Sequence, residues 1–359
     1  MSFTQADLTQ GSVWRQLIRY AVPIITTSLL QAGYGIVDMI IVSQYLGEVG
    51  TSAVNNASQV IRIITNLAIG LCNGGSVLIG QYFGSKDSEN RHRVTGTFLT
   101  LFALLGVLFS VVFFSLSHPL MALLRAPALQ EAVAYMRISS VGILFIFGYN
   151  MLAVTLRSMG NSKTPLYCIL VSAVLNILLD LLFVGPLQMG VGGAALATVL
   201  SQGLSFGLAF SYLWRHREFF TFERRYLKLE RINVRRIFKI GVPCALQMTI
   251  AGISWLTVTG LINTYGVLYS AASGISVKIR DFSHLFLTSM STGTSAMIAQ
   301  TLGAGLYARA KKVMYTSMLL TFLLALLGVG LIEPFAPFAV SLFTPDVQVA
   351  RIAVLNLRI

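Results

Sequence analysis

Stretches of about 20 apolar residues recur along nearly the whole chain, and this pattern limits the possible fold more than any other feature. A helix of that length crosses the hydrocarbon core of a membrane. Lipid offers no hydrogen-bond partner to free backbone groups, and the stretches are too long and too evenly apolar for barrel strands. Only 11% of the 359 residues are charged. The sequence therefore predicts an all-α membrane protein.

The apolar stretches predict nine complete membrane spans and the start of a tenth. Their bounds are 16–46, 52–82, 94–117, 130–158, 165–187, 191–214, 237–264, 267–301, 313–343 and a stub from 346. The polar N-terminus holds Asp7 and lacks a basic region followed by a cleavage site, so we expect no removable signal peptide.

Basic residues gather in alternate connections between the spans. One set of connections carries 19 of the 26 Lys and Arg residues, nine of them between residues 215 and 239. The opposite set carries only Arg125. Because Lys and Arg accumulate on the cytoplasmic side, the N-terminus and the 215–239 linker are predicted to be cytoplasmic in a plasma (inner) membrane. The net charge of +13 thus indicates contact with anionic lipid rather than with nucleic acid.

The sequence lacks the usual signatures of enzymes. It contains no phosphate loop, no H-E-x-x-H motif and no nucleophile elbow. Its cysteines, Cys72, Cys168 and Cys244, lie in or beside apolar spans without metal-binding spacing. A membrane enzyme or receptor would need a catalytic constellation or a sizeable soluble domain. We therefore expect no enzyme and no cofactor, and an ion gradient as the source of energy.

An internal repeat relates the two parts of the chain. Val22-Pro23 and Val242-Pro243 open corresponding spans 220 residues apart, and Gln81 to Gly84 matches Gln300 to Gly303 at an offset of 219. We expect a first half at 1–218, a linker at 219–236 and a second half at 237–359. Six spans in the first half make the repeat parallel, which is typical of carriers that hold substrate between two halves.

Three motifs carry a family resemblance. They are the turn from Leu156 to Pro165, the segment from Asn176 to Phe183 and the segment from Gly190 to Gln202. Together they resemble the multidrug and toxic compound extrusion (MATE) family. The resemblance implies two parallel six-helix halves and antiport of drugs or organic cations against Na⁺ or H⁺. It also implies a monomer when full length. Lipid-linked oligosaccharide flippases share the plan, and they usually have a cationic central cavity, so this alternative stays open.

The length departs from the family pattern. A complete second copy would extend well past Ile359, so helices 11 and 12 and most of helix 10 are expected to be missing. We expect that residues 1–359 alone do not complete a transport cycle, because the missing helices would open one wall of the cavity.

Polar residues deep in the first half predict an ion-coupling site. Asp38 lies about 13 Å below the outer turn, and Asp180 lies about 10 Å deep with Asn176 one turn away and Thr198 at similar depth. Carboxylates at such depth are costly and usually functional, and this oxygen-rich set suits a proton or, if the carrier is sodium-coupled, Na⁺. The repeat mates of Asp38 are Thr257 or Val258, so the site is expected only in the first half.

A second set of residues is expected to line a substrate cavity. The set is Tyr34, Tyr149, Asn150, Met248, Trp255, Lys278 and Arg280. Aromatic residues and methionines suit promiscuous binding. Arg62 and Asp281 are further charges within spans. We expect Asp281 to neutralise a neighbouring cation in a structural pair, which is cheaper than leaving charges alone in a membrane.

Overall fold

The computed structural model describes residues 7–124, 126, 128–341 and 347–358, and these residues form helices and connections without a strand. The helices are α1 (Val13–Gly84), α2 (Ser88–Ser115), α3 (Ser117–Leu123), α4 (Leu129–Ser158), α5 (Lys163–Val184), α6 (Gly190–Arg215), α7 (Arg231–Asn263), α8 (Val267–Gly303), α9 (Tyr307–Ser341) and α10 (Val347–Arg358). The predicted all-α fold is confirmed. Seven of the described helices are long and apolar enough to cross a membrane.

α1 contains two of the predicted spans in one 72-residue helix. The backbone leaves helical geometry only at Gly47, whose φ is 62°. Residues with a Cβ avoid this left-handed region, so glycine allows the chain to reverse within a single residue. We expected an outer loop over 47–51, and this was wrong because the helix resumes directly after Gly47. We call the two parts the first limb (13–46) and the second limb (48–84).

Other boundaries also differ from the prediction. α7 begins at Arg231 and α9 at Tyr307, each six residues before the expected span. Their first turns are rich in basic residues, which a helix tolerates once it has left the hydrocarbon. α8 is long, but Ser, Thr and charged residues interrupt its apolar sequence, so it is not among the seven apolar helices.

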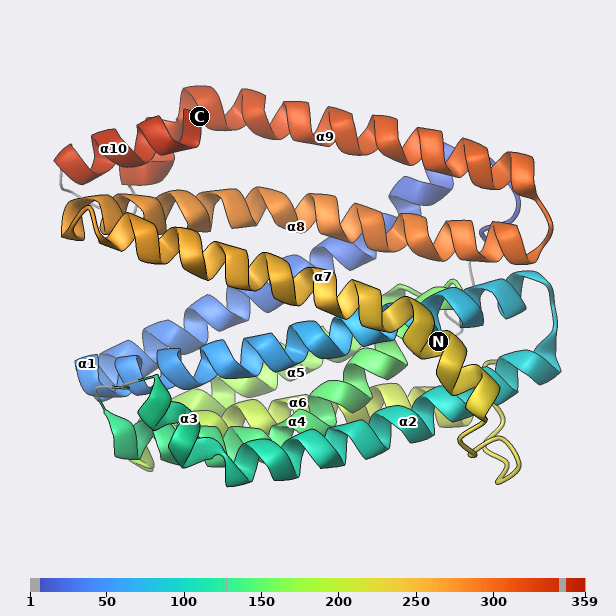
Figure 1. Cartoon of the computed structure of the whole chain (residues 1–359), viewed down its shortest axis with the longest axis horizontal. Coiled ribbons are helices and arrows are strands. Elements are labelled where there is room, and N and C mark those ends of the chain that lie inside the picture. The colour runs from blue at the N-terminus through green and yellow to red at the C-terminus, as the bar shows by residue number, and fades with distance from the viewer. Residues whose placement is uncertain (1–6, 125, 127, 342–346, 359) are drawn as a thin grey trace.

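The helices form an elongated bundle in which α1 joins two groups (Figure 1). α2 to α6 lie on one side of the second limb of α1, and α8 to α10 lie on the other, while α7 crosses this limb. The largest core cluster lies in the first group, where Phe98, Phe102 and Phe147 are fully buried. A second cluster joins the start of α1 to α8 and α9 through Leu17, Tyr20 and Met297. Both limbs of α1 therefore contact both groups.

Corresponding glycines bring the two halves together at one end of the bundle. A methyl group on Gly84 would overlap the backbone oxygen of Gln300, and a methyl group on Gly303 would overlap that of Gln81. The repeat makes the two contacts equivalent, because Gly84 corresponds to Gly303 and Gln81 to Gln300 at the offset of 219. Gly80 and Ala299 are also mates, and a Cβ on Gly80 would lie 2.8 Å from the Ala299 Cβ. The second limb of α1 and α8 thus meet with local twofold symmetry.

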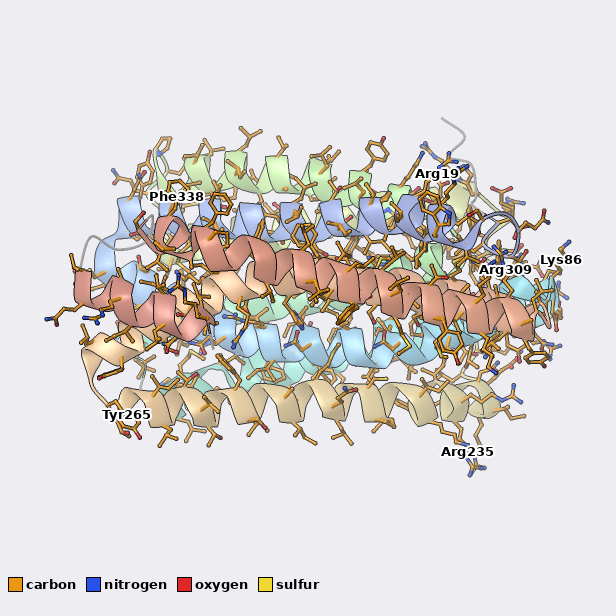
Figure 2. All side chains as sticks on the ribbon, turned by 90° about the horizontal axis from the view of Figure 1, so that it is seen from above. Arg19, Lys86, Arg235, Tyr265, Arg309 and Phe338 are labelled. Carbon is orange, nitrogen blue, oxygen red and sulfur yellow. The ribbon has the colours of Figure 1, made fainter. Side chains whose placement is uncertain are left out.

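Hydrogen bonds between the halves follow the same seam. Gln300 Nε2 donates to the backbone oxygen of Ser158 at 2.7 Å, and the Ser28 and Ser289 hydroxyls are 3.0 Å apart. Arg309 donates to the backbone oxygens of Gln10 and Gly11 at 2.7 and 2.9 Å. Arg19, Lys86, Arg235 and Arg309 all lie at this end of the bundle, whereas Tyr265 and Phe338 lie at the other (Figure 2). The basic end of the bundle is therefore the closed end.

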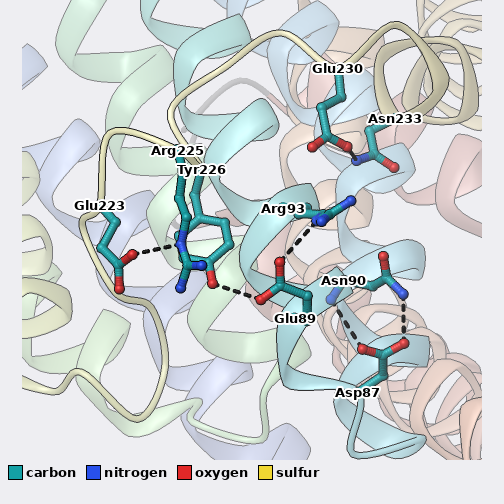
Figure 3. A network of polar contacts seen from close by, with 9 residues as sticks. All are labelled: Asp87, Glu89, Asn90, Arg93, Glu223, Arg225, Tyr226, Glu230 and Asn233. Carbon is teal, nitrogen blue, oxygen red and sulfur yellow. Dashed lines mark hydrogen bonds and ion pairs between the residues drawn. The ribbon is translucent and has the colours of Figure 1, made fainter.

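The basic linker packs against the start of α2 rather than extending freely (Figure 3). The Tyr226 hydroxyl donates to Glu89 Oε2 at 2.7 Å, and Arg93 pairs with the other Glu89 oxygen at 3.1 Å. These two hydrogen bonds lower the pKa of the Glu89 carboxyl. Thr97 Oγ1 donates to the backbone oxygen of Lys228 at 2.9 Å. The linker thus ties the start of α7 to the first half.

Candidate ion and substrate site

Four helices of the first half each direct two polar residues, one helical turn apart, toward the same place. The pairs are Tyr34 and Asp38 from α1, Tyr135 and Ser139 from α4, Asn176 and Asp180 from α5, and Thr198 and Gln202 from α6. Residues four apart share a helix face, which is why each helix contributes a pair. All except Asp180 line one cavity of about 150 Å³, which Ser58 from the second limb also lines. Asp180 lies one turn from Asn176 toward the outer end of α5.

Several buried acidic and amide atoms of this cluster are unsatisfied. Asp180 is fully buried and Asn176 is nearly so. Apart from the contact between the two carboxyl groups, three sets of atoms lack a hydrogen-bond partner among the described residues. They are both Asp180 oxygens, Asp38 Oδ1 and both polar atoms of the Asn176 side chain. Asp38 and Asp180 nevertheless lie close enough to interact electrostatically. Buried polar atoms are normally satisfied, so these unpaired atoms mark a candidate site for a cation or proton.

The four residues predicted from the sequence are thus brought together by the fold. Thr198 donates its hydroxyl proton to the backbone oxygen of Ala194 at 3.1 Å, which leaves the lone pairs of the hydroxyl oxygen as possible ligands. Among the described residues no three His, Cys, Asp or Glu side chains gather into a metal centre. An ion here would therefore depend on amide and hydroxyl oxygens beside the two carboxylates, which suits a hard cation.

Sequence reasoning missed Tyr135. It is buried in α4 and interacts electrostatically with both carboxyl groups, and its hydroxyl lies beside Ser58 and Thr198. Its spacing of four residues from Ser139 was the available signal. That signal is weak, because a tyrosine in a membrane helix is usually a packing residue.

A larger cavity of about 250 Å³ adjoins the cluster. Tyr34, Asn176, Thr198 and Gln202 line both cavities. The cluster of four polar pairs, which we call the candidate ion cluster, therefore forms one wall of the larger space. The rest of the lining is neutral and includes Gln31, Thr65, Tyr149, Asn150, Ser172 and Ser201. Such a mixed polar and aromatic lining allows several orientations of a bound organic molecule.

The predicted substrate residues divide into separate groups. Tyr34, Tyr149 and Asn150 line the cavity beside the candidate ion cluster. Trp255 and Arg280 line a different cavity of about 640 Å³ in the second half, where the Arg280 guanidinium lies 4.2 Å from the Trp255 ring centre. Met248 is exposed and lines neither of these cavities, and the same holds for Lys278. A single cavity with all seven residues is therefore not formed.

The predicted structural ion pair of Asp281 is also absent among the described residues. Asp281, Lys278 and Arg62 are exposed, and the described salt bridges, Arg93–Glu89 and Arg225–Glu223, lie near the basic end. Residues 278 and 281 are nearly neighbours on α8, but Arg280 turns toward Trp255 instead of toward the acid. The acid and the cations thus remain separate on the faces of two helices.

Comparison with known proteins places this bundle in a family. The MatE family model matches residues 23–182 and 243–359. The chain belongs to the MATE family. The two matched segments begin at Pro23 and Pro243, the pair of prolines that opens the internal repeat.

Individual relatives agree with this assignment. The chain is 30% identical over 354 residues to the probable multidrug resistance protein YoeA of Bacillus subtilis (strain 168), which covers 96% of this chain and 76% of that protein. It is 32% identical over 303 residues to the probable multidrug resistance protein YpnP of the same organism, covering 83% of this chain and 67% of YpnP. The curated relatives are thus longer than this MATE chain.

The fold also matches solved MATE structures. A crystal structure of MATE in the straight conformation has a TM-score of 0.92 at 25% identity, covering 99% of this chain and 80% of that chain. An outward-facing multidrug resistance MATE transporter of the MOP superfamily also has a TM-score of 0.92, at 24% identity, covering 100% and 80%. The bundle of this chain therefore has the MATE fold.

Proposed function

We propose that this protein is a multidrug efflux antiporter that exports organic cations or other drugs while Na⁺ or H⁺ moves inward. The observation that carries the proposal is the pair Asp38 and Asp180, whose unpaired oxygens lie beside a neutral cavity in the same half. Buried carboxylates in a membrane protein are costly, and they are retained where an ion is bound or exchanged. The names of the relatives YoeA and YpnP point to drugs as the exported class.

The geometry supplies a simple exchange. Two neighbouring buried carboxylates favour a cation between them, because uncompensated negative charge is expensive in the interior. Asn176 and Thr198 lie on the wall between the carboxylates and the larger cavity, so occupancy of one side affects the other. An ion entering from outside and a cation arriving from the cytoplasm compete for the same charge. The binding of one therefore favours the release of the other.

Transport of a fluorescent organic cation tests the proposal, measured in proteoliposomes with the chain extended to the full length of its relatives. A Na⁺ gradient and a pH gradient are imposed separately, and efflux is expected with one of them and not in the absence of both. Asp38→Asn removes the charge and keeps the shape, so it should abolish gradient-driven transport while the protein still inserts. Transport that persists without any gradient would contradict antiport.

We also place the basic end of the bundle in the cytoplasm. Arg19, Lys86, Arg235 and Arg309 gather there (Figure 2), as the charge rule for cytoplasmic loops requires. A single cysteine at position 224 should resist a membrane-impermeant thiol reagent added to intact cells. A cysteine at position 125, which lies outside the described residues, should react. Labelling at position 224 from outside would reverse the topology.

The flippase alternative is not favoured. The two cavities beside Asp38 are lined by neutral residues and one acid, without a Lys or Arg side chain. A phosphate-bearing lipid headgroup needs cations at its binding site. Arg280 supplies one cation, but it lines the separate cavity of the second half.

A further inference from the structure

Two exposed polar stripes run along the helices that meet at the basic end. On the second limb of α1 the stripe contains Asn55, Gln59, Arg62 and Asn66, and on α8 it contains Lys278, Asp281, Thr288, Thr292 and Ser295. Spacings of three and four residues place each set on one helix face. A polar face on a membrane helix is stable where it borders water or protein rather than lipid.

The stripes point toward the seam between the halves. Arg62 precedes Gly80 by 18 residues, and Asp281 precedes Ala299 by 18 residues. At 3.6 residues per turn, 18 residues make five full turns, so Arg62 shares the face of Gly80 and Asp281 shares that of Ala299. Gly80 and Ala299 face each other directly. Arg62 and Asp281 therefore face the local twofold axis between the two helices. Each lies about 27 Å from its seam residue, toward the outer end.

The outer parts of the two helices are apart in this structure. α8 and the second limb of α1 approach each other at the basic end and diverge toward the other end (Figure 1). Arg62 and Asp281 are exposed there, and neither forms an ion pair within the part of the chain that the structure describes. Both stripes are exposed although they face the same side of the seam, so the space between the two helices is open at this end. Opposite charges stand on its two sides, and we call this space the outer cleft.

The repeat singles out this pair. Arg62 and Asp281 are mates at the offset of 219, so a local twofold axis relates their positions. The neighbouring pairs of corresponding residues do not have opposite charges, since Asn55 corresponds to Gly274 and Gln59 to Lys278.

We propose that Arg62 and Asp281 form an ion pair that holds the outer cleft shut when the protein opens toward the cytoplasm. If the two helices pivot at the seam until the cleft closes, residues that correspond in the repeat come together along the two stripes. Gly80 and Ala299 already meet in this way. The pair loses water as it forms, so its attraction strengthens on closure and is absent when the cleft is open. The inference rests on the proposed function only in requiring a state with a closed outer cleft.

Thiol accessibility tests the pair without any drug or ion gradient. A cysteine at Asn66, one turn deeper on the same stripe, reports the open cleft when an impermeant reagent is added from outside. The background replaces Cys72, Cys168 and Cys244 by Ala. Arg62→Asp and Asp281→Arg should each raise the labelling rate about fivefold, and the double exchange should return it to that of the parent. Asn55→Asp adds an acid opposite Gly274 and should leave the rate unchanged.

Cross-linking provides a second, independent measurement. With an oxidant, the pair Arg62→Cys and Asp281→Cys should form a disulfide, whereas Asn55→Cys with Asp281→Cys should not, because position 55 lies about 10 Å further along the helix. Three results would overturn the proposal. The single charge variants could label at the parent rate, the double variant could label as fast as the single variants, or both cysteine pairs could cross-link equally. Since transport is not measured, each of these outcomes leaves the antiport assignment untouched.

Discussion

The two halves of the molecule share a helix plan but differ in what their helices enclose. In the first half the outer parts of α4 and α5 and the first limb of α1 surround Asp38 and Asp180. At the corresponding place in α7, Thr257 donates its hydroxyl to the Ile253 backbone oxygen, and Val258 is 44% exposed. Duplication thus reproduced the seam, where Gly84 and Gly303 make equivalent contacts. The proposed ion coupling depends on polar residues that only one copy carries.

The largest expected effect tests this asymmetry directly. Asp38→Asn and Asp180→Asn should each abolish ion-driven efflux, because each removes half of the charge that attracts the coupling cation. All variants are made in a full-length background. Efflux of a fluorescent cation from vesicles, with membrane levels measured in parallel, provides the comparison. The matched control is Thr257→Asn at the repeat mate of Asp38, which should transport normally. Normal transport by both acid variants would place the coupling site elsewhere.

The symmetric seam predicts equal costs in the two halves. Gly84→Ala and Gly303→Ala each place a methyl group against a backbone oxygen of the other half, and each should lower the free energy of unfolding by roughly 1–3 kcal/mol. Thermal unfolding in detergent measures the effect. Gly207→Ala in α6 is the control, since no atom lies within 4 Å of the added Cβ. A loss of unfolding free energy at only one of the two seam glycines would show that the two contacts are not equivalent.

Gln81 and Gln300 are mates that differ in their bonding within the described residues. Gln300 is fully buried and donates to the Ser158 backbone oxygen, so Gln300→Ala should cost about 1–2 kcal/mol of unfolding free energy. Gln81 is only half-buried. Gln81→Ala should therefore cost clearly less in the same thermal assay. Equal losses would mean that the Gln300 bond adds little to the contact between the halves.

The smallest expected effect concerns the linker, which has no counterpart in the first half. Hydrogen bonds from Tyr226 and Arg93 lower the pKa of Glu89 in the folded protein. The stabilisation they give is therefore present above the unfolded pKa of 4.5 and is lost as the pH falls through the lower folded value. Limited proteolysis of residues 216–230 should accelerate in this acidic range.

Glu89→Gln provides the control for the linker. It removes the titrating group, so the linker should be cleaved faster at neutral pH and should not accelerate further through the same acidic range. An unchanged pH profile in this variant would assign the effect to another group, with Asp87 the nearest candidate because its pKa is also lowered by hydrogen bonds from Asn90.

Much of the fold followed from the sequence alone. Apolar length determined the helices, because free backbone groups have no partner in lipid. The family motifs from Leu156 to Gln202 indicated the MATE bundle, which the family match at residues 23–182 and 243–359 then established. Depth and helical spacing also picked out Asp38, Asn176, Asp180 and Thr198 before any coordinates, because charged and polar groups are rare at such depth.

The tertiary structure decided which of these residues meet. Tyr135 joins the acids through a face of α4 that spacing alone did not distinguish from packing. Trp255 and Arg280 belong to another cavity, and Asp281 stands apart from its expected partner. Sequence periodicity gives the face of a helix but not the neighbour across from it. That neighbour depends on how helices cross, which here is set by the close approach of Gly84 and Gly303 to the opposite half.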